Sequence, residues 1–588
     1  MYMTKEMRNT SKNKVLLVAV NAKYIHSNLA VYCLKKYSEE FGDNIEIAEF
    51  TINQYTDYII QNIYKRKPKV IAFSCYIWNI GYVTILIKNL RKVLKNVEIW
   101  VGGPEVSYRA EDFMREYPQV DGVMVGEGEK VFHNLMKLWI TKGNDAVDYH
   151  GLKEERMEAL GCIRGIVYRN DDGRIVTNPY EELLDLSEVP FPYDDIGRFE
   201  HKIIYYESSR GCPFSCSYCL SSIDKKLRFR DMDLVKKELK YFLDRKIPQV
   251  KFVDRTFNCK KSHAMEIWKF ILEHDNGVTN FHFEISADLI DDEELSLFEQ
   301  MRPGLIQLEI GVQTTNEITI KEINRTMNLE RLKYVVERIN SFGNIHQHLD
   351  LIAGLPYENY ESFIRSFNDV YEMKPEQLQL GFLKVLNGAF MHAKAEDYEL
   401  LYTDEPPYEV MSTKWLSFDE ILELKKIEHV VEIYYNSRQF VNSIKYLEKK
   451  SESPFKMFEG IGNYFEVKKL NEARHSRIKM YEILLEYVNS VFEEDDIFTE
   501  LLKLDVYLRE NIKSRPDFAV KGDENKEEIR EYYKRYKNIS KNIHIEQFSI
   551  DVIKWMKQGE IIRRKQIILF DYRTMTPINH QCHFEEVG

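Results

Sequence analysis

Few cysteines, no long apolar run and no excess of positive charge set the first limits on this chain. Eight cysteines in 588 residues are typical of a reducing compartment and not of a secreted disulfide scaffold. No stretch approaches the length of a membrane-spanning helix, and the apolar residues 15–20 are too short for a signal-peptide core. The net charge of −12 argues against a general nucleic-acid surface. We therefore expect a cytoplasmic protein without a membrane segment.

The length and composition favour a soluble protein of several domains. A chain of 588 residues exceeds one ordinary domain, and two to four are expected. Apolar residues make up 44% and charged residues 30%, which suits globular domains with sizeable cores.

Three cysteines in a C-x-x-x-C-x-x-C pattern follow a short apolar strand at residues 203–207. They are Cys212, Cys216 and Cys219, and we call residues 210–219 the cysteine loop. Thiolates at such spacing hold three corners of an iron–sulfur cube and leave the fourth iron open to a small molecule. The pattern therefore predicts a [4Fe–4S] cluster at this loop.

Two other uses of these cysteines compete with a cluster. A structural zinc ion needs a fourth ligand, and no His or Cys follows at finger-like spacing. Cys259 and His263 lie further along and could serve only if the chain folds back. A disulfide with one spare thiol is the second alternative.

Residues 1–145 alternate between short apolar strands and helical segments. The expected strands are residues 15–20, 45–50, 70–74, 98–102 and 122–125. Residues 81–95, between two of them, repeat apolar side chains at helical spacing. Five strands with intervening helices predict a doubly wound, flavodoxin-like parallel sheet, in which ligands bind at the carboxyl ends of the strands.

Glycine-rich loops follow two of these strands. Their residues are Gly102, Gly103, Pro104 and Glu105 in the first loop, and Gly126, Glu127, Gly128 and Glu129 in the second. Glycine allows backbone amides to come close to a flat or anionic ligand. Two such loops after successive strands predict a ligand site at this edge of the sheet.

A connector is expected at residues 146–200. Residues 161–168 and 174–177 flank an Asp–Gly turn and predict a small hairpin. Pro190 and Pro192 then indicate a linker into the next domain.

Strand–helix alternation resumes at residues 201–400. The expected strands are residues 203–207, 250–253, 281–285, 305–311, 345–352 and 377–383. Six such units predict a partial (β/α)6 barrel of TIM-like type, with its site at the carboxyl ends of the strands. The polar or glycine residues near those ends are Asp254, Ser286, Glu309, Gln313 and Gly354.

Two features lie within these strands. Glu309, an acid in an apolar strand, destabilises it unless it meets a partner or a ligand. His346 and His348 alternate along one strand and so face the same side. A contact with substrate and burial with a hydrogen-bond partner are equally compatible with that placement.

Residues 401–588 predict a third, mainly helical domain. Helical periodicity extends from residue 418 to about 511, a charge run follows at 521–541, and residues 561–570 indicate a terminal strand. Cys582 lies near His580 and His583 in what we expect to be a polar tail.

The cysteine loop, with Tyr218 before its last cysteine, resembles the cluster loop of radical S-adenosylmethionine (SAM) enzymes. The resemblance implies that the open iron binds the amino and carboxylate groups of SAM. It also implies that an electron from the cluster cleaves SAM to a 5′-deoxyadenosyl radical, and that Tyr218 lies beside the adenine. A low-potential donor such as flavodoxin or ferredoxin would supply the electron.

The two glycine-rich loops resemble those of the cobalamin-binding domain that precedes many radical SAM domains. The D-x-H-x-x-G loop of histidine-ligated cobalamin proteins is absent, and residues 21–26 stand in its place. The resemblance therefore implies cobalamin, bound by the loops at 102–105 and 126–128, without a histidine on cobalt. An approach of His26 or Tyr24 to the lower face stays open, as does a degenerate domain without cofactor.

Within the barrel, the resemblance assigns residues to parts of SAM. Asp254 takes the position of the acid that holds the methionine amino group, although the family's glycine pair is missing there. The remaining assignments are Ser286 and Arg325 for the methionine carboxylate, Glu309 and Gln313 for the ribose, and Gly354 for the adenine.

The sequence thus resembles a cobalamin-dependent radical SAM protein of a subfamily with an uncharacterised C-terminal domain. This resemblance implies an enzyme, most simply one that methylates an unactivated carbon. A radical rearrangement or ring contraction without methyl transfer is an alternative, and a cluster-bearing redox or binding protein without turnover is another. No feature of the sequence names the substrate.

Overall fold

The computed structural model describes residues 14–140, 153–492, 495–512, 514–519, 526–536, 541–576 and 580–588. The chain forms two compact units. The first comprises Met1–Ile285, Ile323–Thr326 and Leu383–Thr413, and the second comprises Ser286–Glu322, Met327–Phe382 and Lys414–Gly588.

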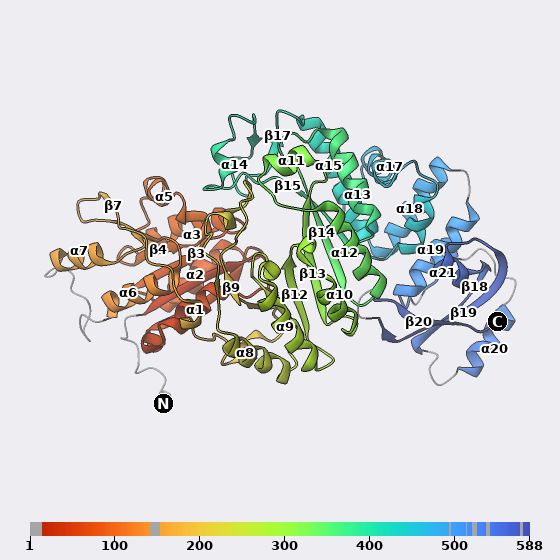
Figure 1. Cartoon of the computed structure of the whole chain (residues 1–588), viewed down its shortest axis with the longest axis horizontal. Helices are drawn as coiled ribbons and strands as arrows, with labels where there is room; N and C mark the ends of the chain where they lie inside the picture. The colour runs from red at the N-terminus through yellow and green to blue at the C-terminus, as the bar shows by residue number, and fades with distance from the viewer. Residues whose placement is uncertain are drawn as a thin grey trace, which may run out of the picture. The chain divides into compact units, whose positions relative to one another are not determined.

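A parallel sheet organises the N-terminal part of the first unit (Figure 1). Its strands are β1 (Val15–Asn21), β2 (Ile45–Thr51), β3 (Val70–Ser74), β4 (Glu98–Gly102) and β5 (Gly122–Met124). They run in the order β2-β1-β3-β4-β5. This confirms the predicted flavodoxin-like sheet, with strand bounds within about one residue of those expected.

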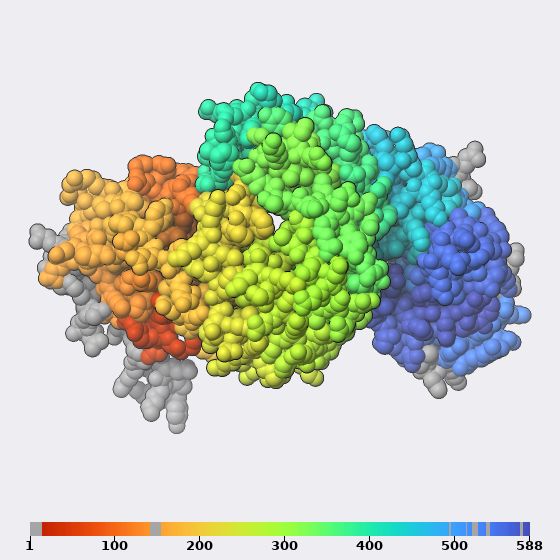
Figure 2. Space-filling model, viewed as in Figure 1, coloured from red at the N-terminus to blue at the C-terminus, as the bar shows by residue number. Residues whose placement is uncertain are grey.

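Both faces of this sheet are covered, as the burial of strand β1 along its whole length shows. Leu16, Val18 and Val20 enter one core, while Val15, Leu17 and Ala19 enter the other. The covering helices are α2 (Thr56–Arg66), α3 (Ile80–Val93) and α5 (Ala110–Glu116) on the first face, and α1 (Leu29–Tyr37) and α6 (Gly128–Ile140) on the second. In Figure 2 these residues form one closely packed red and orange body.

The predicted hairpin exists, but it extends this sheet. Strand β6 (Ile166–Arg169) pairs antiparallel with β5, and β7 (Ile175–Thr177) pairs with β6. The first residues of the expected strand 161–168 instead close helix α7 (Lys153–Cys162), so that part of the prediction was wrong. Residues 146–152 of the expected connector lie outside the described residues.

All six strands expected for the barrel are present. The first unit contains parallel strands β8 (Ile204–Tyr206), β11 (Gln249–Phe252) and β12 (Asn280–Ile285), and helices α8 (Met232–Asp244) and α9 (Lys261–Glu273). The second contains parallel strands β13 (Ile306–Gln313), β14 (His346–Ala353) and β15 (Gln377–Phe382), and helices α12 (Leu329–Phe342) and α13 (Tyr360–Glu372). The partial barrel is therefore confirmed at the level of its βα units.

The C-terminal domain is mainly helical, as expected, but it also contains a sheet. Its helices include α15 (Phe418–Val431), α16 (Val441–Glu448), α17 (Pro454–Val467), α18 (Arg477–Val491), α19 (Asp496–Arg509), α20 (Lys526–Arg535) and α21 (Val552–Gln558). Strands β18 (Ile543–Ile550), β19 (Arg563–Met575) and β20 (Cys582–Glu586) form an antiparallel sheet. The expected polar tail was wrong, since Cys582 is buried in β20. Among the described residues, none of the helices is both long and apolar enough to cross a lipid bilayer.

Candidate functional site

The cysteine loop begins at a two-residue strand that holds its backbone. Strand β9 (Ser209–Arg210) pairs antiparallel with β10 (Arg228–Phe229). Gly211 has a φ of +96°, and a Cβ there would lie 2.7 Å from the carbonyl oxygen of Lys226. The turn into the loop therefore needs glycine at this position.

The three thiols differ in exposure. Cys212 and Cys216 are buried, and Cys219 is half-buried. The guanidinium of Arg325 lies 3.9 Å from the sulfur of Cys216 and 3.1 Å from the hydroxyl of Tyr218. Burial raises the pKa of Cys216, and the charge of Arg325 opposes that rise. Three thiols on one loop beside a cation are a donor set that fits a cluster held at three corners.

The residues considered for zinc do not join the thiols at one point. The ring of His263 lies 3.0 Å from the hydroxyl of Ser208, and burial lowers its pKa to about 4. Cys259 is close enough to Cys212 for that thiol to help raise its pKa, after burial, to about 11. Across the described residues, no three His, Cys, Asp or Glu side chains lie close enough together to hold a single metal ion.

Asp254 holds the residues that precede the cysteine loop. Its buried carboxylate accepts hydrogen bonds from the backbone and hydroxyl of Ser208 and from the hydroxyl of Ser209. Burial raises its pKa to about 6 against the effect of these bonds. The structure thus gives Asp254 a positioning contact, and its predicted role toward the methionine amino group stays a prediction.

The glycine-rich loop after β4 packs closely against the residue after β3. Gly103 has a φ of +118°, and a Cβ there would lie 2.4 Å from the carbonyl oxygen of Cys75. Gly126, in the loop after β5, has a φ of +80° and open space where its Cβ would stand. The exposed backbone and open space at Gly126 fit the approach of a large flat ligand such as cobalamin to this edge of the sheet.

The loop after β1 is anchored within the protein. His26 shares a hydrogen bond of 2.7 Å between its Nδ1 atom and the hydroxyl of Tyr205, and burial lowers its pKa. Tyr24 is 68% exposed. His26 is therefore held by a protein partner and is not a solvated loop histidine.

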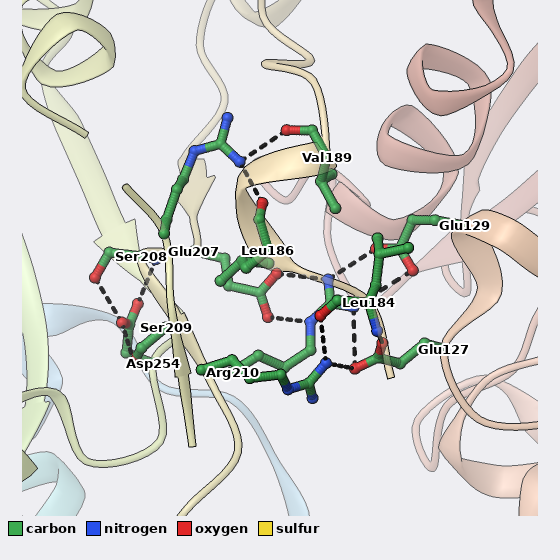
Figure 3. Close-up of polar contacts among 12 residues, drawn as sticks. Glu127, Glu129, Leu184, Leu186, Val189, Glu207, Ser208, Ser209, Arg210 and Asp254 are labelled. Atoms are coloured by element: carbon green, nitrogen blue, oxygen red, sulfur yellow. Dashed lines mark hydrogen bonds and ion pairs between the residues drawn. The ribbon is translucent and has the colours of Figure 1, made fainter. Parts of the chain in front are cut away.

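A buried ion-pair network connects the two predicted cofactor regions (Figure 3). Arg210, the first residue of the cysteine loop, donates to Glu207 at 2.7 Å and to Glu129 at 2.7 Å. Burial alone would raise the pKa of Glu129, but the Arg210 guanidinium outweighs it and holds that pKa below its usual range. The sequence alone gave no role to Arg210 or Glu207. The position of Arg210, two residues before Cys212, was the only indication of a functional cation there.

Glu127 belongs to the same network. One of its oxygens lies 2.6 Å from Arg228, and the other accepts a hydrogen bond of 3.0 Å from the backbone of Leu184. The acids of this loop therefore hold protein groups, and Gly126 is the loop residue with open space around it.

The second unit contains the other residues predicted for SAM. Ser286 donates to Asp288 at 2.7 Å. Glu309 and Gln313 are half-buried on the same side of β13, and Gln313 has a φ of +73° at a bulge. Gly354, with a φ of +91°, follows β14. The register places Glu309 opposite His348, which lies 3.0 Å from Asp350. His348 therefore has a charged partner on its own strand.

Comparison with known families identifies three regions. The family described as "B12 binding domain" matches residues 15–136, and the family described as "Radical SAM superfamily" matches residues 206–370. The family described as "Protein of unknown function (DUF4080)" matches residues 396–570.

Curated relatives match part of this chain. The cobalamin-dependent radical SAM methyltransferase TokK of Streptomyces tokunonensis is 24% identical over 65% of this chain and 57% of its own length. The anaerobic magnesium-protoporphyrin IX monomethyl ester cyclase of Rubrivivax gelatinosus is 23% identical over 57% of this chain and 60% of its own length. The chain thus spans less than two thirds of either relative.

Solved structures share the fold. The cobalamin-dependent SAM radical enzyme OxsB with aqua-cobalamin bound matches with a TM-score of 0.55 at 15% identity, covering 90% of this chain and 84% of that chain. The radical SAM methyltransferase TsrM of Kitasatospora setae matches with a TM-score of 0.54 at 15% identity, covering 68% and 82%.

The region that matches the B12-binding family contains the parallel sheet, and the region that matches the radical SAM superfamily contains the cysteine loop and most of the strand–helix units. The chain thus combines a B12-binding domain, a radical SAM domain and a C-terminal domain of unknown function. The matches support the three predicted cofactors, which are cobalamin, SAM and a [4Fe–4S] cluster.

Proposed function

We propose that this protein is a cobalamin-dependent radical SAM methylase that transfers a methyl group to an unactivated carbon of a substrate still to be identified. Its domain composition supports the cofactors, and the methyltransferases among its relatives support the reaction. The cyclase among those relatives keeps a radical reaction without methyl transfer as the competing outcome of the test below.

One observation carries this proposal. The buried pair of Arg210 and Glu129 joins the strand before Cys212 to the first turn of helix α6, directly after the predicted cobalamin loop. A buried ion pair with good geometry constrains the groups on both sides of it. The regions predicted to hold the cluster and cobalamin are thus neighbours within the first unit, which supports a reaction that uses both cofactors.

Different residues of the chain would bind the cluster and cobalamin. Cys212, Cys216 and Cys219 would hold the cluster, and the loops at 102–105 and 126–128 would hold cobalamin. When bound, the cluster supplies an electron for SAM cleavage and cobalamin supplies a transferable methyl group. Burial of Cys212 and Cys216 keeps water from the thiols, and Arg325 keeps a positive charge beside them.

The SAM contacts complete the proposal. Tyr218, fixed by Arg325, would lie beside the adenine. The other contacts would come from Asp254, Ser286, Glu309, Gln313 and Gly354, with the roles given above. A low-potential donor such as flavodoxin or ferredoxin would reduce the cluster, and we expect the protein in the cytoplasm.

Anaerobic reconstitution tests the proposal. The protein, loaded with iron, sulfide and hydroxocobalamin, is incubated with SAM and a strong reductant, and both SAM products are quantified. The methylase produces 5′-deoxyadenosine together with S-adenosylhomocysteine. Formation of 5′-deoxyadenosine alone favours a rearrangement, and the absence of both products would overturn the enzyme assignment.

Two cysteine variants sharpen this test. Cys216→Ala removes one cluster corner and should lower iron content and abolish both products. Cys162→Ala changes an exposed cysteine at the end of helix α7 and should leave both unchanged. Full activity of Cys216→Ala would contradict the cluster assignment.

A further inference from the structure

Residues Leu383–Thr413, which we call the bridging segment, belong to the first compact unit although the residues before and after them belong to the second. The segment contains the short helix α14 (Phe390–Ala393) and a hairpin of β16 (Leu401–Tyr402) and β17 (Val410–Ser412). The backbone of Val385 donates to the carbonyl of Tyr408 at 3.0 Å, so the two ends of the segment lie together.

The segment contacts the glycine-rich loop after β4 through a buried hydrogen bond. The hydroxyl of Tyr408 donates to the carboxylate of Glu105, which is 9% exposed. Burial raises the pKa of Glu105, and the bond from Tyr408 opposes that rise. A buried carboxylate without a donor is strongly disfavoured, so Tyr408 stabilises Glu105 in this position.

A second contact involves the residues just after that loop. A Cβ on Gly388 would lie 2.6 Å from Cγ and 2.8 Å from Cβ of Tyr108. Only glycine allows the segment to approach Tyr108 this closely, and its φ of +90° also favours glycine. The side chain of Tyr108 thus lies directly against the backbone of the bridging segment.

A third contact reaches the cysteine loop. The backbone of Met391 donates a hydrogen bond of 2.8 Å to the carbonyl of Ser217, which lies between Cys216 and Tyr218. The amide of Ser217 donates in turn to the carbonyl of Ile323 at 2.9 Å. The middle of the cysteine loop is therefore held through both the amide and the carbonyl of Ser217.

We infer that the bridging segment is a positioning element that holds the loop at Gly102–Glu105 and the cysteine loop in a fixed relation, with Tyr408 and Gly388 as its positioning residues. Tyr408 lies within the region of unknown function, so this assigns a role to the start of that region. The functional consequence of this inference rests on the proposed function. If the two loops bind cobalamin and the cluster, the segment fixes the position of one cofactor site relative to the other.

Hydrogen exchange of the protein without added cofactors tests the inference independently of the reaction. Tyr408→Phe and Gly388→Ala should each speed amide exchange about fivefold, both in peptides covering residues 102–109 and in peptides covering residues 212–222. The reason is that the loss of a contact increases the population of locally opened states. Tyr446→Phe, which removes a similar phenol–carboxylate bond to Asp495, and Gly173→Ala, at an exposed positive φ of +79°, should leave both peptides unchanged.

Product ratios of the reconstituted enzyme supply the second readout. In Tyr408→Phe, the ratio of S-adenosylhomocysteine to 5′-deoxyadenosine should fall about fivefold, whereas general destabilisation would lower both products together. Exchange that stays unchanged in either loop, or rises equally in the control variants, would overturn the inference. If neither variant nor parent forms products while the exchange pattern holds, the proposed function fails and the positioning role stands.

Discussion

The Nη2 atom of Arg210 lies 2.7 Å from an oxygen of Glu129, and both side chains are largely shielded from solvent. The same nitrogen also donates to Glu207, so one guanidinium connects the strand before Cys212 with the first turn of helix α6. The acidic residues of the glycine-rich loop at residues 126–129 thus stabilise the contact between the parallel sheet domain and the cysteine loop.

Replacement of Arg210 should destabilise this junction. Arg210→Gln leaves the buried carboxylate of Glu129 and the half-buried carboxylate of Glu207 without this cation, which should lower the free energy of local opening by about 3 kcal/mol. Native-state hydrogen exchange of peptides from β5 and α6 measures that free energy. Arg174→Gln is the matched control, since its ion pair with Asp172 is exposed and should change the value by about 0.5 kcal/mol or less. Equal effects of the two variants would contradict this account.

Gly103 should tolerate no side chain. Gly103→Ala combines a strained positive φ with a collision against the carbonyl of Cys75, and we expect a loss of about 3 kcal/mol in stability and reduced retention of cobalamin. Gly173→Ala shares the positive φ but meets open space, so it should lose only about 1 kcal/mol. Thermal unfolding and absorbance after gel filtration measure both effects. Cobalamin retention in Gly103→Ala at the level of Gly173→Ala would argue against a ligand at this loop.

Asp254 should make stability depend on pH. Its pKa of about 6 in the folded protein lies above the usual value of 3.8, so the folded protein binds this proton more tightly than the unfolded chain. The resulting stabilisation is full below about pH 4 and is lost as the pH rises through about 6, amounting to about 3 kcal/mol.

The variant Asp254→Asn isolates this effect because an amide does not ionise. The stability of the variant relative to the parent should improve by about 3 kcal/mol between pH 4 and pH 8. A difference between Asp254→Asn and the parent that is independent of pH would contradict the assignment of the titration to this group.

Arg325 should raise the reduction potential of a bound cluster. Its positive charge, 3.9 Å from the sulfur of Cys216, favours the more negative reduced state. Arg325→Gln should therefore lower the potential by on the order of 50 mV, or about 1 kcal/mol, in a redox titration followed by electron paramagnetic resonance. Arg325→Lys keeps the charge and should fall between the two. An unchanged potential in Arg325→Gln, with iron content intact, would contradict this role.

Features that depend on a short stretch of sequence were predicted more accurately than features that depend on distant contacts. The strands of the first sheet were predicted within about a residue, because a strand buried on both faces reads as a continuous apolar run. The hairpin was predicted as a linker feature, since a short strand does not reveal which sheet edge it joins. Strand β20 was missed because only two of its side chains, Cys582 and Phe584, are not exposed.

The sequence by itself determined the cysteine loop, the doubly wound sheet and the barrel strands, because each depends on spacing or periodicity along a short stretch of chain. Only the tertiary structure decided which side chains meet over long separations: Arg210 with Glu129, Asp254 with Ser208, and Tyr408 with Glu105. A charged or polar residue far along the chain does not reveal its partner. That pairing is set when folding buries the group and removes the water that would otherwise solvate it.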